Sequence, residues 1–345
     1  MNWPTLRWLP RLALPGLVLA LLAAGCGARH APEESVENPY ARQAQALTQA
    51  GIAAMQRERW DYAANVFARA LKAAQLTADV RLAAHEWYNL GTAHAAMGKN
   101  DEAAADFRRA EELAREAGDA AHVMRARLAR ALLPGGDDAW RPGALPANFP
   151  ADVHLAAGRL AERRGDAKAA AEEYGRALKR ADKSRIGLLY QGEARLGLAR
   201  LARAAGDAGQ AARHAEAAIT LFRQVGAPRL IAHALLLDAR VTVDPARARH
   251  QARQAWLIYQ ALEDGRGQRD ALQLLATRAA QAGDEASAAR WRARLEKLGR
   301  EARESAGKEP AHAAGAPDGA EEANPMREAP GHEESPGEEP EGAEP

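Results

Sequence analysis

The chain has one cysteine, Cys26, among its 345 residues, and aromatic side chains make up only 5% of it. Disulfides within the chain and thiolate metal sites are therefore excluded, because both need more than one cysteine. β-Branched residues are scarce as well, while alanine, leucine and arginine are abundant. Since β-branched and aromatic residues favour strands and alanine favours helices, the composition predicts an all-α fold.

Sequence patterns for catalysis are also missing. His85 and Glu86 begin a zinc-protease pattern, but Asn89 stands where the second histidine is needed. The sequence has no Gly-x-Ser-x-Gly elbow and no phosphate-binding glycine loop. Its arginines and lysines are dispersed among acidic residues instead of forming an aromatic-rich basic patch, which argues against nucleic acid. We therefore expect a protein that is not an enzyme and that binds neither a metal nor nucleic acid.

The first 25 residues have the pattern of an export signal. Arg7 and Arg11 lie near the start, and an apolar run from Leu12 to Ala24 ends in small residues before Cys26. This run is shorter than the roughly twenty apolar residues that a membrane-spanning helix needs. The pattern is therefore typical of a signal peptide, residues 1–25, and predicts an exported protein.

The end of this segment, Leu22-Ala23-Ala24-Gly25-Cys26, resembles the lipobox of bacterial lipoproteins, with alanine where leucine is more usual three residues before the cysteine. The resemblance implies cleavage after Gly25, a covalent diacylglycerol and an N-acyl lipid on Cys26, and a lipidated tether over residues 26–40. Gly27 stands where aspartate would imply retention in the inner membrane, so the resemblance favours the outer membrane. No other cofactor is expected.

From about residue 44 the chain repeats itself. The clearest unit, near 84–117, has large and small residues at characteristic places, namely Trp87, Leu90, Gly91, Gly98, Ala103, Phe107 and Ala110. This spacing resembles the tetratricopeptide repeat, in which two helices form a hairpin and small residues allow close packing. The resemblance implies a right-handed superhelical solenoid of such hairpins over residues 41–300.

Similar units start near 44, 84, 151, 192, 229 and 269. Most are about six residues longer than the usual 34, which predicts helices longer than the family's minimum. The larger gap before 151 holds an apolar-periodic segment, residues 120–133, and a proline-rich loop, residues 134–150. Either this loop divides the solenoid into two halves, or Trp140 and Phe149 pack into the seam, and we favour the second because large aromatics prefer burial.

Residues 301–345 contain thirteen acidic and three basic side chains, a net charge of −10, against a net of +1 for the whole chain. The segment is rich in proline, glutamate and glycine and has almost nothing apolar beyond alanine. It is therefore predicted to be a disordered acidic tail. Because the rest of the chain is basic, two roles are open for the tail: it folds back over a basic groove, or it is a solvating spacer with no preferred contact, and we favour the second.

In the family, the first helix of each hairpin lines a concave ligand groove. Carried onto this chain, its groove positions select Ile52 and Met55 in the first unit and Tyr88 in the second. In the third and fourth units they select arginines, namely Arg159, Arg163, Arg200 and Arg203. The clamp that some members use for a peptide's terminal carboxylate is matched here only by Asn89, which argues against that ligand class.

Two functions remain open from the sequence. The first is a periplasmic scaffold, anchored to the outer membrane, that binds a protein or peptide partner in the cell envelope. By resemblance it would act in envelope assembly, pilus or secretin biogenesis, or regulation of a peptidoglycan synthase. The alternative is direct binding of an anionic envelope polymer or glycolipid by the basic groove. Their response to salt should distinguish them, since screening weakens arginine contacts to a polyanion.

Overall fold

The computed structural model describes residues 38–137 and 140–306 and contains thirteen helices and no strand in this part of the chain. The expectation of an all-α fold is confirmed. The predicted signal peptide, Cys26 and the predicted tail beyond residue 306 lie outside the described residues.

The helices follow one another with short turns, except before α6. Their bounds are α1 Pro39–Gln56, α2 Trp60–Gln75, α3 Val80–Ala96, α4 Asn100–Glu116, α5 Ala120–Ala131, α6 Ala151–Arg163, α7 Ala167–Arg180, α8 Arg185–Ala204, α9 Ala208–Val225, α10 Pro228–Val241, α11 Pro245–Ala261, α12 Gly265–Gln281 and α13 Glu285–Ala306.

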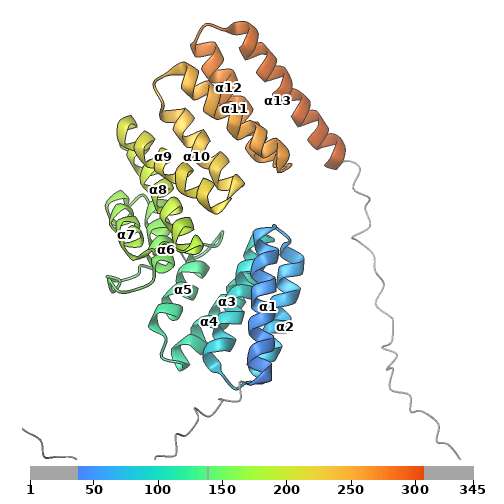
Figure 1. The fold of residues 1–345 in the computed structure, drawn as a ribbon, viewed down its shortest axis with the longest axis vertical. Helices are drawn as coiled ribbons and strands as arrows, with labels where there is room; N and C mark the ends of the chain where they lie inside the picture. The colour runs from blue at the N-terminus through green and yellow to red at the C-terminus, as the bar shows by residue number, and fades with distance from the viewer. Residues whose placement is uncertain (1–37, 138–139, 307–345) are drawn as a thin grey trace, which may run out of the picture.

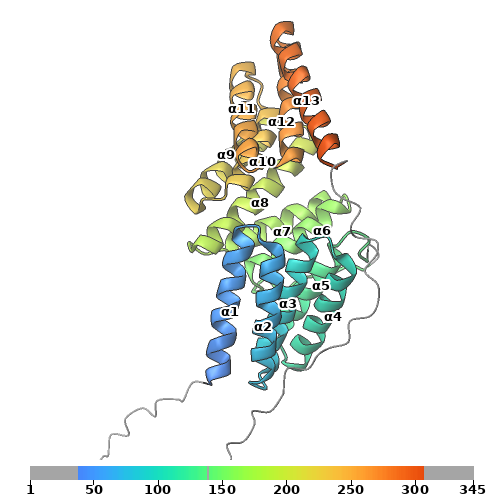
Figure 2. The ribbon, with the colours of Figure 1, turned by 90° about the vertical axis from the view of Figure 1, so that its right-hand side faces the viewer.

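Twelve of these helices form six hairpins that stack into an elongated solenoid (Figure 1). The pairs are α1–α2, α3–α4, α6–α7, α8–α9, α10–α11 and α12–α13, and each hairpin packs on the next except where α5 lies between α3–α4 and α6–α7. Each contains one of the unit starts located in the sequence. Turned by 90°, the stack shows α1–α5 at one end and α10–α13 at the other, with α6–α8 between them (Figure 2).

Capping side chains and residues with a left-handed backbone conformation define the ends of the helices. Asp166 accepts a hydrogen bond from the Ala169 amide at the start of α7, and Ser184 does the same for Gly187 at the start of α8. Glycines with positive φ follow the C-terminal ends of several helices and allow the chain to turn sharply there, as Gly98 with φ 77° does after α3. Glu58 adopts the same conformation with φ 57°, although it carries a β-carbon.

The repeat spacing reflects contacts between glycines and aromatic rings. Gly91 in α3 faces Phe107 in α4, and a β-carbon added to the glycine would lie 2.9 Å from the ring. Gly51 faces Phe67 and Gly158 faces Tyr174 at the same sequence separation of sixteen residues. The absence of a side chain therefore lets the two helices of a hairpin approach until the ring fills the seam.

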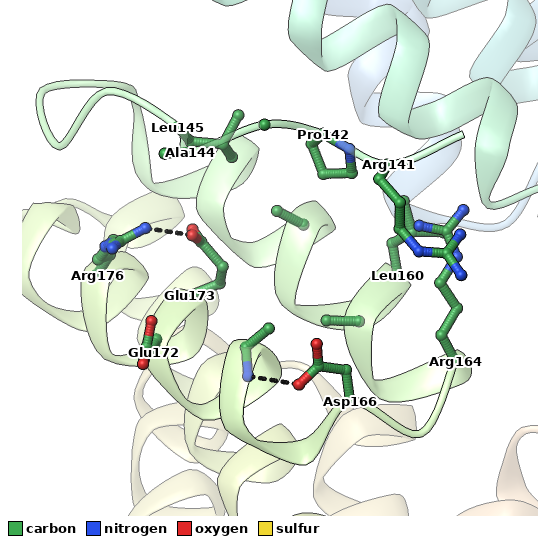
Figure 3. A pocket seen from close by; sticks show the side chains of 14 residues that line it. Arg141, Pro142, Ala144, Leu145, Leu160, Arg164, Asp166, Glu172, Glu173 and Arg176 are labelled. Carbon is green, nitrogen blue, oxygen red and sulfur yellow. Dashed lines mark hydrogen bonds and ion pairs between the residues drawn. The ribbon is translucent and has the colours of Figure 1, made fainter. Parts of the chain in front are cut away.

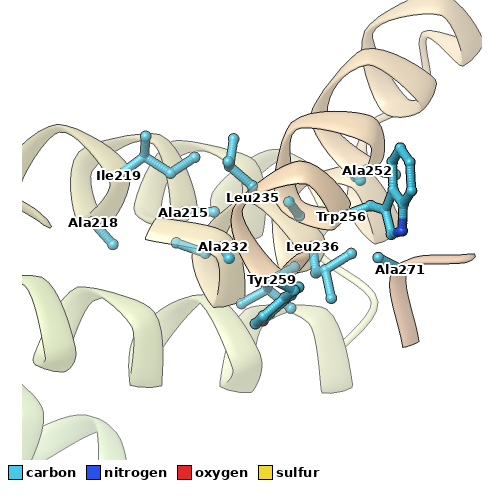
Figure 4. Close-up of a cluster of buried hydrophobic side chains, with 14 of the residues drawn as sticks. Ala215, Ala218, Ile219, Ala232, Leu235, Leu236, Ala252, Trp256, Tyr259 and Ala271 are labelled. Atoms are coloured by element: carbon cyan, nitrogen blue, oxygen red, sulfur yellow. The ribbon is translucent and has the colours of Figure 1, made fainter. Parts of the chain in front are cut away.

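The C-terminal hairpins share a continuous apolar core. Tyr259 and Trp256 of α11 lie among small and aliphatic residues of α9, α10 and α12 (Figure 4). Trp291 of α13 meets Trp256 edge-on, with ring centroids 5.8 Å apart. The exposed Arg292 stands beside it at the repeat's aromatic position, so the last unit differs from the others where its outer face meets water.

The segment between α5 and α6 packs against the solenoid. Trp140 and Phe149 lie partly buried against a cluster that contains Leu128 of α5 and Val153 of α6. The Arg127 guanidinium lies over the Trp140 ring, 4.6 Å from its centroid. This packing matches the interpretation in which the aromatics fill the seam.

Two boundaries from the sequence are wrong. The tether was expected to extend to residue 40, but α1 begins at Pro39. The tail was expected to begin at residue 301, but α13 continues to Ala306. Its last turns still carry alternating charges that a helix tolerates on its exposed side, as in the Lys297–Glu301 pair at 3.6 Å. Among the described helices, none has the length and apolar character needed to cross a membrane.

Candidate functional site

The inner helices enclose a central groove of about 870 Å³. Side chains from α1, α3, α5, α6 and α8, together with Phe107 of α4, line it, so it lies on the inner side of the stack between the N-terminal hairpins and the middle ones. We call this cavity the central groove. Three of the residues selected from the sequence, Met55, Tyr88 and Arg159, lie together in its wall.

The floor of the central groove is a row of rings. The Tyr88 ring lies 5.5 Å from that of Phe107 and 5.5 Å from that of His122, and His122 lies 4.2 Å from His85. Burial lowers the pKa of His85, and it lowers the pKa of His122 to about 4. Burial also raises the pKa of Tyr88. These rings are therefore uncharged near neutral pH.

The contacts of His122 define its tautomer. Its Nε2 lies 3.1 Å from the Ala84 carbonyl oxygen, which can only accept, so Nε2 carries the proton. Its Nδ1 lies 2.9 Å from Arg125 Nη1 and accepts from that guanidinium. Arg125 in turn donates to both carboxylate oxygens of Asp152, at 2.5 and 3.2 Å. One chain of hydrogen bonds thus joins α3, α5 and α6 across the groove.

The arginines near the groove are matched by acceptors. Arg159 pairs with Glu193 at 2.5 Å, and Arg200 pairs with Glu162 at 2.6 Å. Arg163 donates to carbonyl oxygens at the end of α5, those of Ala131 and Leu133. The expectation of a basic groove is therefore wrong for this part of the chain. A linear sequence shows the arginines, but it does not show that carboxylates of neighbouring hairpins lie within reach of them.

The remaining predicted positions lie outside the central groove. Ile52 is 42% exposed on α1 but is not part of the groove wall. Arg200 and Arg163 point toward neighbouring helices, as their contacts show. Arg203 is exposed near the end of α8. The structure therefore brings together three of the seven proposed contacts and separates the other four.

Sequence reasoning missed three groove residues, His122, Arg125 and Tyr190. The first two lie on α5, the helix without a hairpin partner, where no repeat frame was placed. Tyr190 lies in the first turns of α8, before the repeat start at 192, and burial raises its pKa to about 12. The Ser184 cap is the signal that could have extended α8 backward to include it.

A smaller cavity of about 390 Å³ lies between residues 141–145 and helices α6 and α7 (Figure 3). Polar side chains that line this cavity already form a helix cap or ion pairs. Asp166 caps α7, and Glu173 pairs with Arg176 and with Nδ1 of the buried His154 at 2.7 Å. Because these groups already have partners and do not converge on the cavity, we regard it as a packing gap beside the loop.

Metal binding has no support in the described part of the chain. Residues 38–137 and 140–306 contain no group of three or more His, Asp or Glu side chains placed to hold an ion.

Comparison with known proteins agrees with this architecture. The tetratricopeptide repeat family matches residues 85–116. None of the curated proteins compared with the chain matches it. Among solved structures, the apo form of the quorum sensor NprR from B. thuringiensis superposes with a TM-score of 0.53 at 13% identity, covering 75% of this chain and 77% of that one.

Two further structures show the same fold at low identity. The apo form of RapI has a TM-score of 0.53 at 8% identity and covers 75% of this chain and 77% of its own. A Signal Transduction ATPase with Numerous Domains from Pyrococcus horikoshii, which has a tetratricopeptide repeat sensor, has a TM-score of 0.52 at 14% identity. It is covered over 45% of its length and this chain over 77%. The chain therefore contains a tetratricopeptide repeat at residues 85–116 and shares the helical-repeat fold of these proteins.

Proposed function

We propose that this protein is a scaffold that binds an extended segment of a protein partner in the central groove. The observation that carries the proposal is the groove itself, about 870 Å³ in volume, with an uncharged floor of rings and with ion pairs already formed along its wall. Such a surface offers stacking area and neutral hydrogen-bonding groups without a net charge to satisfy. A peptide meets these conditions well.

Tyr88 is the residue expected to contribute most to binding. Its ring is held by Phe107 and His122, so its conformation is fixed before a ligand arrives and little side-chain entropy is lost on binding. Tyrosines in such positions are frequent hot spots at protein interfaces. Asn89 and Thr92 lie in the same wall and supply polar atoms for a peptide backbone.

The cellular setting is part of the proposal and rests on the sequence. The signal-like segment and the lipobox-like residues before Cys26 support export and lipidation, and Gly27 supports the outer membrane. Several acyl chains, at about 0.8 kcal/mol per buried CH₂, would anchor the chain stably with its solenoid facing the periplasm. The proposed role is binding, in envelope assembly, pilus or secretin biogenesis, or regulation of a peptidoglycan synthase, and not catalysis.

Direct binding of an anionic polymer receives no support from the geometry. Arg125, Arg159 and Arg200 each have a carboxylate within hydrogen-bond distance, so a polyanion would have to displace an existing partner. Binding of a partner segment in the central groove should accordingly depend weakly on ionic strength. A steep loss of affinity with salt would favour the polymer instead.

The test is photo-crosslinking in cells from position 88, with position 62 as the control. Tyr62 is also a surface tyrosine, 50% exposed, but it lies on α2 and away from the groove wall. We expect a defined protein adduct from position 88 and none from position 62. The partner identified by mass spectrometry should then bind the Tyr88→Ala variant at least about tenfold more weakly than the parent. Equal affinities, or the same adduct from both positions, would contradict the proposal.

A further inference from the structure

A second cavity, of about 540 Å³, lies where the first hairpin meets the fourth and fifth. The first hairpin is not a neighbour of the fourth or the fifth along the stack, so its contact with them arises from the curvature of the solenoid. We call this cavity the seam pocket. Its wall is largely apolar and includes Trp60 at the start of α2, Ile186 and Leu189 of α8, and Leu230 of α10. Ile186 is 57% exposed, so part of this apolar wall is accessible to a partner.

One arginine holds the rim of the seam pocket. Arg229, in the first turn of α10, donates through Nε and Nη2 to the two carboxylate oxygens of Glu58, at 2.7 and 2.6 Å. It also pairs with Asp264, which caps α12 by accepting from the Gly267 amide. Asp264 thus belongs to the adjoining hairpin, whereas Glu58 reaches Arg229 from 171 residues away in the sequence.

The Glu58 carboxylate is replaceable. Its side chain is 43% exposed, and exposed ion pairs contribute little to stability. Its backbone is left-handed, with φ 57°, a conformation that is unfavourable for a residue with a β-carbon. A carboxylate from another molecule could therefore take its place on Arg229 with little loss to the fold.

Further positive charge surrounds the seam pocket. Arg57 lies on the rim and is exposed, and its guanidinium forms no hydrogen bond or ion pair within the described chain. Arg185 donates only to the Val225 carbonyl oxygen, at 3.2 and 3.1 Å, so no carboxylate neutralises it. An apolar wall below a cationic rim is complementary to an apolar side chain that is followed by an acid.

We propose that the seam pocket binds a partner segment with a bulky apolar side chain next to a carboxylate, and that Glu58 occupies the carboxylate position in the unbound chain. This inference rests on the proposed function, because it supplies a second anchor for the same protein partner. The two anchors adjoin at Met55, which lines both cavities. A segment leaving the central groove past this residue would enter the seam pocket.

The probes are two labelled peptides, Ser-Gly-Leu-Leu-Glu-Gly-Ser and the same sequence with glutamine in place of glutamate. Binding to the full mature chain in detergent is followed by fluorescence anisotropy. We expect the glutamate peptide to bind about tenfold more tightly than the glutamine peptide. Glu58→Gln should strengthen binding of the glutamate peptide severalfold, because it leaves Arg229 available. Ile186→Asp should weaken binding of both peptides.

The control variant is Glu112→Gln, which removes another exposed carboxylate paired with an arginine, Arg109, at 2.9 Å on α4. It should bind both peptides as the parent does. Equal affinity for the two peptides, no change in Glu58→Gln, or no binding of the glutamate peptide at about 1 mM would overturn the inference. Loss of binding in Tyr88→Ala but not in Ile186→Asp would do so as well. A partner captured from position 88 would then leave the proposed function standing without the seam pocket.

Discussion

Tyr174 lies between two glycines of different hairpins, and this arrangement gives the sharpest stability prediction. Its fully buried ring contacts Gly158 of α6 on one side and Gly197 of α8 on the other. A β-carbon at residue 158 would lie 2.7 Å from Cδ1 and 2.8 Å from Cε1 of the ring. The ring has little room to retreat, because its hydroxyl donates to Glu162 at 2.5 Å and its opposite edge meets Gly197.

The expected effect of Gly158→Ala combines two opposing contributions. Overpacking a rigid core costs about 1–3 kcal/mol, while replacing glycine by alanine inside a helix returns about 1 kcal/mol. We therefore expect a net destabilisation of about 0–2 kcal/mol. Gly175, next to Tyr174 in α7, has no atom within 4 Å of its added β-carbon. Gly175→Ala should instead stabilise the protein by about 0.5–1 kcal/mol.

Urea denaturation followed by circular dichroism compares the two variants, and hydrogen exchange locates the change. Repeat proteins open locally, so Gly158→Ala should increase exchange in α6, α7 and α8 more than in α12 and α13. The contrast between the variants is the decisive quantity, because both make the same chemical change. If Gly158→Ala were as stabilising as Gly175→Ala, the ring would not be confined as described.

Other consequences can be measured independently. Cys26→Ser should release the protein from the membrane fraction, and a variant that still floats with outer membranes would disprove the lipidation proposal. Ala103→Leu should destabilise by about 1–3 kcal/mol, because Ala103 is fully buried beside Phe107, whereas Ala105→Leu on the exposed side of α4 should be tolerated. Folding lowers the pKa of His122 from 6.5 to about 4, so as the pH falls the unfolded state binds this proton before the folded state does. The free energy of unfolding should therefore drop by up to about 3 kcal/mol as the pH is lowered from about 6.5 to about 4. His122→Gln should flatten that part of the stability profile measured by urea denaturation, and an unchanged slope would refute the assignment.

The sequence carries the local geometry of the hairpins well. Glycine and aromatic residues sixteen positions apart mark the seams because one hairpin contains both partners, as Gly91 and Phe107 show. In the fourth hairpin, the repeat position that usually holds an aromatic residue holds Ala215. Phe222 packs on Gly192 instead, so the repeat spacing no longer predicts which aromatic ring fills the seam of this hairpin. The helical class and the stack followed from such local patterns.

The candidate site was harder to predict, since its contacts join hairpins. Arg200 was selected as a groove contact, but it pairs with Glu162, 38 residues earlier. The pair between Glu58 and Arg229 depends on the curvature of the whole stack, which is the sum of small rotations between repeats. No pattern within one unit carries that information.

The unpaired helix α5 has a consequence for the layers of the solenoid. The inner layer runs α3, α5, α6, α8, α10 and α12, as the contacts between successive members show. Two inner helices, α5 and α6, therefore follow each other, and the irregular residues 132–137 and 140–150 stand where an outer helix would be. Because α5 has no partner helix, this segment takes the outer place between α5 and α6. The alternation of inner and outer layers therefore continues unchanged from α6 onward. Cutting it to a short turn would exchange the layers from α6 onward and place Arg159 and Tyr190 on the convex face, whereas lengthening it would leave the alternation intact.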